Sequence, residues 1–328
     1  MNVAIDHLPG RLAPDLAELM RQVEAEAGPL VDATLLAPAV GRKLVEEGNR
    51  RWNTDLPAMA SVAEIVIPAD AGLGSAACPV KVLVPPGSGP GALFFIHGGG
   101  FAFGSRQSHE RCARVLALEC GLSVLMPDYR LAPEHPFPAG LMDVIACLRG
   151  AFSATAGLGV DPGPLLVSGD SAGANLALAA LLHEAAAGRP LPAGALLFYG
   201  VYGADFETPS YHRYSDGPGL TTAKMQRYWD WYVAEPQARR NPLVAPLLAE
   251  DSALRALPPM HLMAAEIDPL LSDTLHLAAR LTGLGRTEQV HLVPGVTHGF
   301  LQMTKALPAA REALSNAAAA ARAMIRPR

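Results

Sequence analysis

Short runs of apolar residues recur along the chain, and stretches with helical spacing separate them. The runs lie near residues 64–68, 80–84, 92–97, 122–126, 165–169, 193–199, 260–265 and 289–293. From residue 92 onward they are apolar at nearly every position, which is typical of strands buried on both faces of a parallel sheet. We therefore predict an α/β fold: an eight-stranded, mostly parallel sheet with helices on both faces. The first two strands are expected to pair antiparallel at one edge.

Two stretches with amphipathic helical spacing precede the first strand. They span residues 12–27 and 35–51, and Gly28-Pro29 breaks the pattern between them. Because no strand signal comes before them, we expect these helices to form an N-terminal appendage to the sheet.

The alternation of strands and helices breaks once, between residues 199 and 260. This insertion is rich in aromatic side chains: Tyr199, Tyr202, Phe206, Tyr211, Tyr214, Tyr228, Trp229, Trp231 and Tyr232. An insertion at the end of a sheet is a candidate lid. We predict a single domain over residues 1–328, with a helical cap formed by residues 1–51 and about 200–240.

Composition and charge exclude several classes of protein. Half of the 328 residues are hydrophobic and 17% are charged, so the chain can bury a large core and is neither disordered nor fibrous. The net charge of −5 argues against a nucleic-acid partner, which requires a clustered basic face. The longest stretch without a charged side chain, residues 82–105, contains seven glycines and three prolines, so we expect no membrane span.

The four cysteines show no C-x-x-C spacing, which favours free thiols in a reducing compartment. The first 14 residues lack the apolar segment of a signal peptide. Together these features predict a cytoplasmic protein.

The sequence G-D-S-A-G at residues 169–173 has the form of a nucleophile elbow. An apolar strand precedes it, and an Ala/Leu-rich helix follows from residue 172 to 187. A serine at such a junction occupies a sharp, strained turn that projects its hydroxyl from the backbone. The helix N-terminus also places positive dipole beside a developing negative charge. The context therefore predicts Ser171 as a nucleophile.

The sequence H-G-G-G-F at residues 97–101 directly follows another apolar strand. Acyl transfer requires preorganised donors aimed at a tetrahedral oxyanion, and consecutive glycines let backbone N–H groups approach a substrate without interference from a Cβ. In this motif the loop supplies part of the oxyanion hole, and the residue after the nucleophile, here Ala172, supplies the rest. His97 is expected to shape the loop by hydrogen bonds.

A base and an acid should follow the nucleophile in that order along the chain, acid first and histidine last. The histidines downstream of Ser171 are His183, His212, His261, His276, His291 and His298. His298 stands out because it lies in a loop after the last predicted strand. For the acid, Asp268 follows the preceding strand and is favoured, while Glu266 remains a competitor. Asp273, a second competitor, lies in the first turn of a helix, where we expect it to serve as a capping residue.

Taken together, these segments resemble the hormone-sensitive-lipase-like family of bacterial α/β-hydrolase esterases. The resemblance covers roughly residue 60 to the end. It rests on residues 97–101, D-Y-R-L-A-P-E-H at 128–135, residues 169–173, and D-P-L at 268–270 with H-G-F at 298–300. It implies hydrolysis of carboxylic esters without a cofactor, a lid from the N-terminal helices plus the insertion, and often a homodimer.

Carried over residue by residue, the resemblance implies Ser171, Asp268 and His298 as the catalytic triad. It places the oxyanion donors at the backbone N–H groups of Gly99, Gly100 and Ala172. It also implies that Asp128, Arg130 and Glu134 tie down the loop beneath the site. One departure exists: where the family often has Arg after Asp-Pro-Leu, this chain has Leu271-Ser272, so the ion pair of that Arg is missing.

We interpret the chain as a serine carboxylesterase acting on short- to medium-chain esters, with no metal. The candidate substrate-binding residues are Phe101, Tyr228, Trp229, Trp231 and Tyr232. Two alternatives remain: the same machinery acting on an amide, a lactone or a drug-like ester, and a non-catalytic small-molecule receptor on this fold. Related plant receptors lack the catalytic histidine, whereas His298 is present here.

Overall fold

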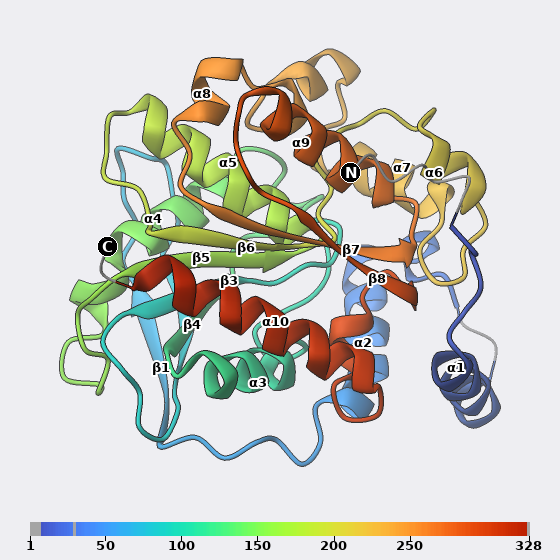
Figure 1. The fold of residues 1–328 in the computed structure, drawn as a ribbon, viewed down its shortest axis with the longest axis horizontal. Coiled ribbons are helices and arrows are strands. Elements are labelled where there is room, and N and C mark those ends of the chain that lie inside the picture. The colour runs from blue at the N-terminus through green and yellow to red at the C-terminus, as the bar shows by residue number, and fades with distance from the viewer. Residues whose placement is uncertain (1–7, 29–30, 327–328) are drawn as a thin grey trace.

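The eight predicted strands all form, and they lie in one sheet. The computed structural model describes residues 8–28 and 31–326 (Figure 1). The strands are β1 (Ser61–Ile67), β2 (Cys78–Val84), β3 (Ala92–Ile96), β4 (Ser123–Pro127), β5 (Leu165–Asp170), β6 (Gly194–Phe198), β7 (Met260–Ile267) and β8 (Val290–Thr297). Their order is β1-β2-β4-β3-β5-β6-β7-β8. From β4 to β8 all neighbours pair parallel, whereas β1 pairs antiparallel with β2, as predicted, and β2 with β4.

Helices cover both faces of this sheet, which confirms the predicted α/β-hydrolase fold class (Figure 1). The helices are α1 (Pro14–Ala27), α2 (Pro38–Asn49), α3 (Glu110–Cys120), α4 (Ala139–Ala154), α5 (Ala172–Ala186), α6 (Pro209–Arg213), α7 (Thr222–Tyr232), α8 (Asp251–Arg255), α9 (Leu271–Gly283) and α10 (Pro308–Ile325). Helices α3 and α10 pack on one face, and α4, α5 and α9 pack on the other. Within β3, Leu93 and Phe95 enter the first core, and Phe94 and Ile96 enter the second, as the two-residue period of a strand requires.

The strand at the β8 edge is longer than its sequence pattern predicts. The pattern ends at Val293, because Pro294 and Gly295 interrupt it, but the strand continues to Thr297. Pro294 is exposed and lies on an edge strand, where a missing N–H breaks no ladder bond. This extension carries the chain toward His298.

The N-terminal helices form with shifted bounds. Residue 35 belongs to a short 3₁₀ turn, η2 (Ala33–Leu35), and α2 starts at Pro38 because proline suits the first helical position. A second turn, η3 (Arg50–Trp52), follows α2. At the predicted break, Gly28 ends α1 with φ of 74°, and Pro29 lies outside the described residues. The first seven residues of the predicted cap also lie outside them.

The insertion and the N-terminal segment meet at the end of the sheet where the parallel strands finish (Figure 1). Arg227 of α7 forms an ion pair with Asp32 and also donates to the hydroxyl of Thr34. Two short turns, η4 (Pro236–Arg240) and η5 (Pro246–Leu248), lead from α7 back toward the sheet. Among the described residues, no helix has both the length and the apolar character needed to cross a membrane.

The two tryptophans of α7 differ in burial. Trp229 is completely buried in the core formed with α4 and α5, whereas Trp231 is half-buried beside Phe103. We expect Trp229→Ala to lower the free energy of unfolding by about 3–5 kcal/mol, the usual loss for a large aromatic in a core. Urea unfolding of both single variants is the measurement. Trp231→Ala serves as the matched control and should cost clearly less, and equal losses would contradict this assignment of the anchor.

Candidate active site

Ser171 stands at the junction of β5 and α5 in a strained backbone conformation. Its φ is 55° and its ψ is −120°, an uncommon region for a residue with a side chain. Such strain costs of order 1–3 kcal/mol and persists only when the surroundings enforce it. The N–H of Ser171 donates to the carbonyl of Phe198 at the end of β6, at 2.9 Å. The predicted elbow is therefore the conformation that the structure shows.

The two glycines that flank this serine are required by close approach of backbone. A Cβ at Gly173 would lie 2.0 Å from the carbonyl oxygen of Ile96, at the end of the neighbouring strand β3. A Cβ at Gly169 would lie 2.4 Å from the backbone of Gly173. Both distances are far inside van der Waals contact, so any side chain at either position would push α5 away from the sheet.

A continuous hydrogen-bonded chain links Ser171, His298 and Asp268. The Oγ of Ser171 lies 2.8 Å from Nε2 of His298, and Nδ1 of His298 lies 2.7 Å from Oδ2 of Asp268. The other carboxylate oxygen of Asp268 accepts the N–H of Leu270 at 2.8 Å, which fixes the carboxylate plane. Asp268 is fully buried, while the His298 side chain keeps 13% of its surface exposed. The structure thus brings together the three residues that the sequence placed far apart.

The two competing acids are occupied elsewhere. Glu266 is buried, and its carboxylate accepts the N–H groups of Gly10 at 2.7 Å and Gly295 at 2.8 Å. Glu266 therefore links the N-terminal segment to β8. The capping role expected for Asp273 is wrong: its carboxylate accepts the N–H groups of Tyr202 and Gly203, at 2.7 and 2.9 Å, instead of N–H groups of its own helix. The reason is that the insertion, where it begins after β6, passes next to the first turn of α9.

Two serines join the insertion to the segment behind Asp268, where the expected arginine is missing. The hydroxyl of Ser210 in α6 donates to the carbonyl of Pro269 at 2.5 Å and accepts the N–H of Ser272 at 2.9 Å. In return, the hydroxyl of Ser272 accepts the N–H of Ser210 at 3.2 Å. All of these groups are buried. A neutral hydrogen-bonded pair thus holds this turn in place of an ion pair.

Gly99 and Gly100 lie in the glycine loop (residues 97–104), next to the elbow. The φ angle of Gly99 is 121°, which only glycine adopts readily. That of Gly100 is 59°, which is uncommon for other residues. In the part of the chain that the structure describes, neither their N–H groups nor that of Ala172 donates to another protein group. Three free backbone donors therefore lie in the two segments that border Ser171.

Buried polar groups support the glycine loop from below. Asp170, next to Ser171, accepts the N–H of Gly98 at 2.8 Å and lies 3.4 Å from Nε2 of His109. Burial by itself would raise the pKa of Asp170, but His109 and the bond from Gly98 outweigh it and lower that pKa. Nδ1 of His97 donates to the carbonyl of Gly98 at 2.9 Å, as expected for a residue that shapes the loop. Burial and the nearby His109 lower the pKa of His97 to about 4, so it is neutral at pH 7.

The 128–135 segment is held by ion pairs, as the resemblance implies. Arg130 forms a forked pair with the buried carboxylate of Asp143, through Nε and one terminal nitrogen at 2.8 Å each. Asp128 pairs with Arg106, whose backbone N–H it also accepts. Glu134 instead pairs across to a residue of α2.

Three of the five candidate substrate-binding aromatics are buried side by side. The rings of Phe101 and Tyr232 stack with centroids 3.8 Å apart and planes 3° apart. Trp229 lies 6.0 Å from Phe101, and all three side chains are at most 2% exposed. The end of α7 is thereby anchored on the residue that follows the three glycines.

Tyr228 and Trp231 occupy a second face of α7 and keep part of their surface exposed. Both rings pack edge-on against Phe103, at 5.7 Å. The Tyr228 ring also covers Gly100 so closely that a Cβ there would lie 2.4 Å from it. Tyr228 of α7 is therefore in contact with a glycine of the loop that borders Ser171.

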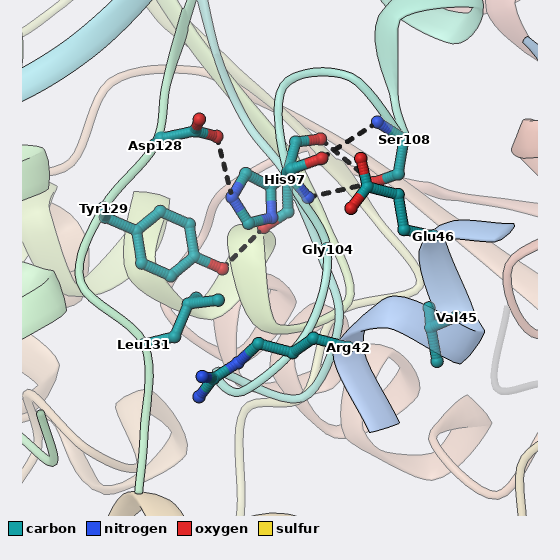
Figure 2. Close-up of a pocket in the computed structure, with 10 residues that line it drawn as sticks. Arg42, Val45, Glu46, His97, Gly104, Ser108, Asp128, Tyr129 and Leu131 are labelled. Atoms are coloured by element: carbon teal, nitrogen blue, oxygen red, sulfur yellow. Dashed lines mark hydrogen bonds and ion pairs between the residues drawn. The ribbon is translucent and has the colours of Figure 1, made fainter. Parts of the chain in front are cut away.

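A cavity of about 310 Å³ lies beside the glycine loop, and Ser171 is not among the residues that line it (Figure 2). His97, Ser108, Asp128 and Tyr129 line it from the sheet side, and Arg42 lines it from α2. Within the described residues, no group of three or more His, Cys, Asp or Glu side chains could hold a metal ion there or elsewhere.

Comparisons with known proteins agree with this geometry. A protein family described as alpha/beta hydrolase fold matches residues 93–302. A carboxylesterase of Mycobacterium tuberculosis is 36% identical over 246 residues, which cover 74% of this chain and 77% of that protein. An ethyl acetate hydrolase of Pseudomonas putida is 32% identical over 92% of this chain and 96% of its own length. An ester hydrolase from the metagenome of Lake Arreo, solved with a derivative of bipyridine phosphonate, superposes with a TM-score of 0.86 at 33% identity, covering 95% of this chain and 98% of that one.

The buried carboxylate of Asp273 makes stability depend on pH. Burial raises its pKa to about 7, although the N–H groups of Tyr202 and Gly203 oppose the shift. Because the unfolded state releases this proton near pH 4, stability is lost as the pH rises toward 7. An Asn oxygen can accept the same two N–H groups without a charge. We therefore expect Asp273→Asn to be more stable than the wild type at pH 8, by at least about 1 kcal/mol, and similar to it at pH 5.

Thermal and urea unfolding at both pH values check this expectation. Asp216→Asn, at an exposed carboxylate of the insertion, is the matched control and should show no such difference between pH 5 and pH 8. A loss of stability at pH 8 in Asp273→Asn would show that the folded state needs the charge.

Proposed function

This chain belongs to the α/β-hydrolase-fold family, in the branch of hormone-sensitive-lipase-like esterases, and hydrolyses carboxylic esters; we propose that it does so through an acyl-enzyme on Ser171. The hydrogen-bonded chain from Ser171 through His298 to Asp268 is the observation that carries this proposal. A serine hydroxyl is a weak nucleophile by itself and requires an adjacent base held by a third group.

The proposed reaction has two halves. Nε2 of His298 takes the proton of the Ser171 hydroxyl as Oγ bonds to the ester carbonyl carbon. The C–O bond to the alcohol then breaks, and His298 gives its proton to the departing oxygen. In the second half, His298 takes a proton from a water molecule as the water oxygen bonds to the acyl carbon. The bond from that carbon to Oγ of Ser171 then breaks, and His298 returns the proton to Oγ. Asp268 keeps the proton of neutral His298 on Nδ1 and stabilises the imidazolium that forms in each half.

We assign the oxyanion hole to the N–H groups of Gly99, Gly100 and Ala172. They are free of other protein partners and border the nucleophile, and Ala172 adds the N-terminal dipole of α5. Donors that are already in place require no reorganisation as negative charge develops on the carbonyl oxygen, which is why such sites are worth several kcal/mol in the transition state.

Of the alternatives left open by the sequence, the receptor is disfavoured by the intact geometry of Ser171 and His298. No feature of the site favours an amide or a lactone over an ester. The relatives at 36% and 32% identity are named a carboxylesterase and an ethyl acetate hydrolase, which supports a small ester with a short chain as the substrate class.

We further propose a single domain whose cap is formed by residues 1–51 and about 200–240. The ion pair from Arg227 to Asp32 joins the two segments and supports this division. Tyr228 is proposed to limit the substrate pocket because its ring touches Gly100. Trp231 packs against the Tyr228 ring, and Phe101, Trp229 and Tyr232 anchor the end of α7 that carries it. The cytoplasmic location is supported by four free, buried cysteines. The homodimer stays a prediction.

Removing the nucleophile should abolish hydrolysis without unfolding the protein. Loss of a triad serine typically lowers turnover by about 10⁶-fold, since only binding and oxyanion stabilisation remain. We expect this loss in Ser171→Ala, measured on p-nitrophenyl acetate, and we expect a phosphonate to label Ser171 alone in the wild type. A label on Ser168, or activity in Ser171→Ala, would be incompatible with the proposed site.

Asp268 and Glu266 offer a matched pair for the acid. Asp268→Asn should lose about 10³–10⁴ in turnover because it favours the wrong His298 tautomer. Glu266→Gln should keep turnover near the wild-type value but lose stability, because its amide cannot accept both buried N–H groups. Steady-state kinetics and thermal unfolding on both variants separate the two effects. The reverse pattern would make Glu266 the acid.

Tyr228 should set the length of acyl chain that is accepted. A large ring at this position leaves little room, and each additional methylene in a fitting pocket contributes only about 0.8 kcal/mol. We expect kcat/KM of the wild type to peak at short acyl chains and to fall for long ones, and we expect Tyr228→Ala to shift the peak to longer chains. Tyr228→Phe keeps the ring and should keep the profile. A wild-type peak at long chains, or an unchanged profile in Tyr228→Ala, would refute this assignment.

A further inference from the structure

The glycine loop is held at its start by groups that belong to the sheet side of the molecule. The hydroxyl of Tyr129 donates to the carbonyl of His97 at 2.9 Å, and the N–H of Gly98 donates to Asp170 at 2.8 Å. These contacts fix the residues before the two glycine donors. They do not fix the residues after them.

At its far end, the loop is held partly by the cap. The N–H of Ala132 donates to the carbonyl of Phe101 at 2.9 Å. The next carbonyl, that of Ala102, accepts Nε of Arg42 at 2.8 Å. Arg42 lies on α2, so a residue of the predicted N-terminal cap binds the backbone two positions after Gly100.

The guanidinium of Arg42 makes several contacts in one plane. Besides Ala102, it donates to the carbonyl of Ala132 at 2.8 Å and forms a two-pronged ion pair with Glu134. Arg42 in turn lowers the pKa of Glu134 below its ordinary value. A lysine ammonium could keep the charge opposite Glu134 but could not reproduce this planar set of donors. Arg42 thus connects the glycine loop to the 128–135 segment.

Helix α2 approaches the loop as closely as its backbone allows. At Gly41, directly before Arg42, a Cβ would lie 2.5 Å from the carbonyl oxygen of Ala33 and 3.0 Å from the ring of Phe103. The same Phe103 ring contacts Tyr228 of α7. The loop end is therefore enclosed between the two segments of the cap.

The space behind the loop is not filled by side chains. Figure 2 shows Arg42 extending from α2 along the cavity of about 310 Å³, with His97, Asp128 and Tyr129 around it. Because packing does not support the loop across this cavity, its position there depends more heavily on directed hydrogen bonds. Among the residues of the cap that the structure describes, Arg42 is the one that donates such a bond to the loop, at the carbonyl of Ala102.

We propose that Arg42 is a positioning residue that holds the glycine loop in the geometry that stabilises the oxyanion, so that the cap contributes to turnover and not to substrate selection alone. This inference rests on the proposed ester hydrolysis at Ser171. Arg42 acts through the loop backbone and needs no contact with substrate. Without it, the peptide units of Gly99 and Gly100 can rotate away from the developing charge, while the apolar walls that bind the substrate stay in place.

The proposal predicts that Arg42→Met lowers turnover much more than it weakens substrate binding. Loss of one oxyanion donor costs about 10²–10³ in turnover, and misaligned donors should cost less. We expect kcat to fall roughly 10- to 100-fold while KM for p-nitrophenyl acetate changes less than about 3-fold. Affinity for a boronic acid that forms a tetrahedral adduct with Ser171 should weaken in proportion to kcat/KM.

Two further variants distinguish positioning from general stability. Arg42→Lys keeps the ion pair with Glu134 but loses the planar donors. Its thermal stability should therefore be higher than that of Arg42→Met, while its kcat should stay as low. It also carries the test if Arg42→Met does not fold. Arg227→Met is the matched control, since Arg227 makes a cap ion pair of similar exposure, with Asp32, and does not touch the glycine loop. Its melting temperature should fall while its kcat stays within about 2-fold of wild type.

Several outcomes would overturn the proposal. They are an Arg42→Met enzyme with wild-type kcat and raised KM, full recovery of kcat in Arg42→Lys, an equal loss of kcat in Arg227→Met, or unchanged boronic acid affinity. If instead the wild type neither hydrolyses the ester nor reacts with a phosphonate at Ser171, the proposed function fails and this inference with it. Labelling of Ser171 in the wild type therefore separates the two failures.

Discussion

The register between β3 and β5 is the constraint on which the candidate site depends. Ile96, the last residue of β3, pairs with Gly169 near the end of β5, so both strands finish at the same level. The glycine loop leaves one strand and the elbow leaves the other, so the segment that carries Gly99 and Gly100 begins at the same level of the sheet as the turn at Ser171. The 2.0 Å that would separate a Gly173 Cβ from the Ile96 carbonyl shows how little freedom this junction has. The strained Ser171 backbone is a consequence of that packing.

The rest of the molecule can be understood as support for these two adjacent turns. From the sheet side, Asp170 binds the N–H of Gly98 and Tyr129 binds the carbonyl of His97. From the cap side, Arg42 binds the carbonyl of Ala102, and the Tyr228 ring covers Gly100. A loop with three glycines has many conformations when free, so each of these contacts offsets entropy that the glycines cost.

The insertion after β6 is fastened to the segment that carries the acid. Asp273 binds the first N–H groups of the insertion, and Ser210 and Ser272 exchange hydrogen bonds beside Pro269. The position of Asp268 is therefore coupled to the packing of the cap. This arrangement uses neutral hydrogen bonds at the place where the family resemblance led us to expect an arginine. It leaves Asp273 as a buried carboxylate, and burial, followed by the charge of Asp268, raises its pKa.

The sequence by itself determined the sheet, because a strand buried on both faces must be apolar at nearly every position and helices must separate such strands. It also predicted the elbow around Ser171 and favoured His298 and Asp268, since the order of strand ends along the chain restricts which residues can meet. It placed the end of β8 too early, because Pro294 breaks the pattern and only an edge position tolerates it. The capping role that it predicted for Asp273 was wrong, because local spacing does not reveal that the insertion passes next to the start of α9. The role proposed for Arg42 had no signal at all, since the carbonyls that it binds lie 60 and 90 residues away. Backbone groups give no trace in a sequence, so contacts of this kind are decided only when the tertiary structure brings the two segments together.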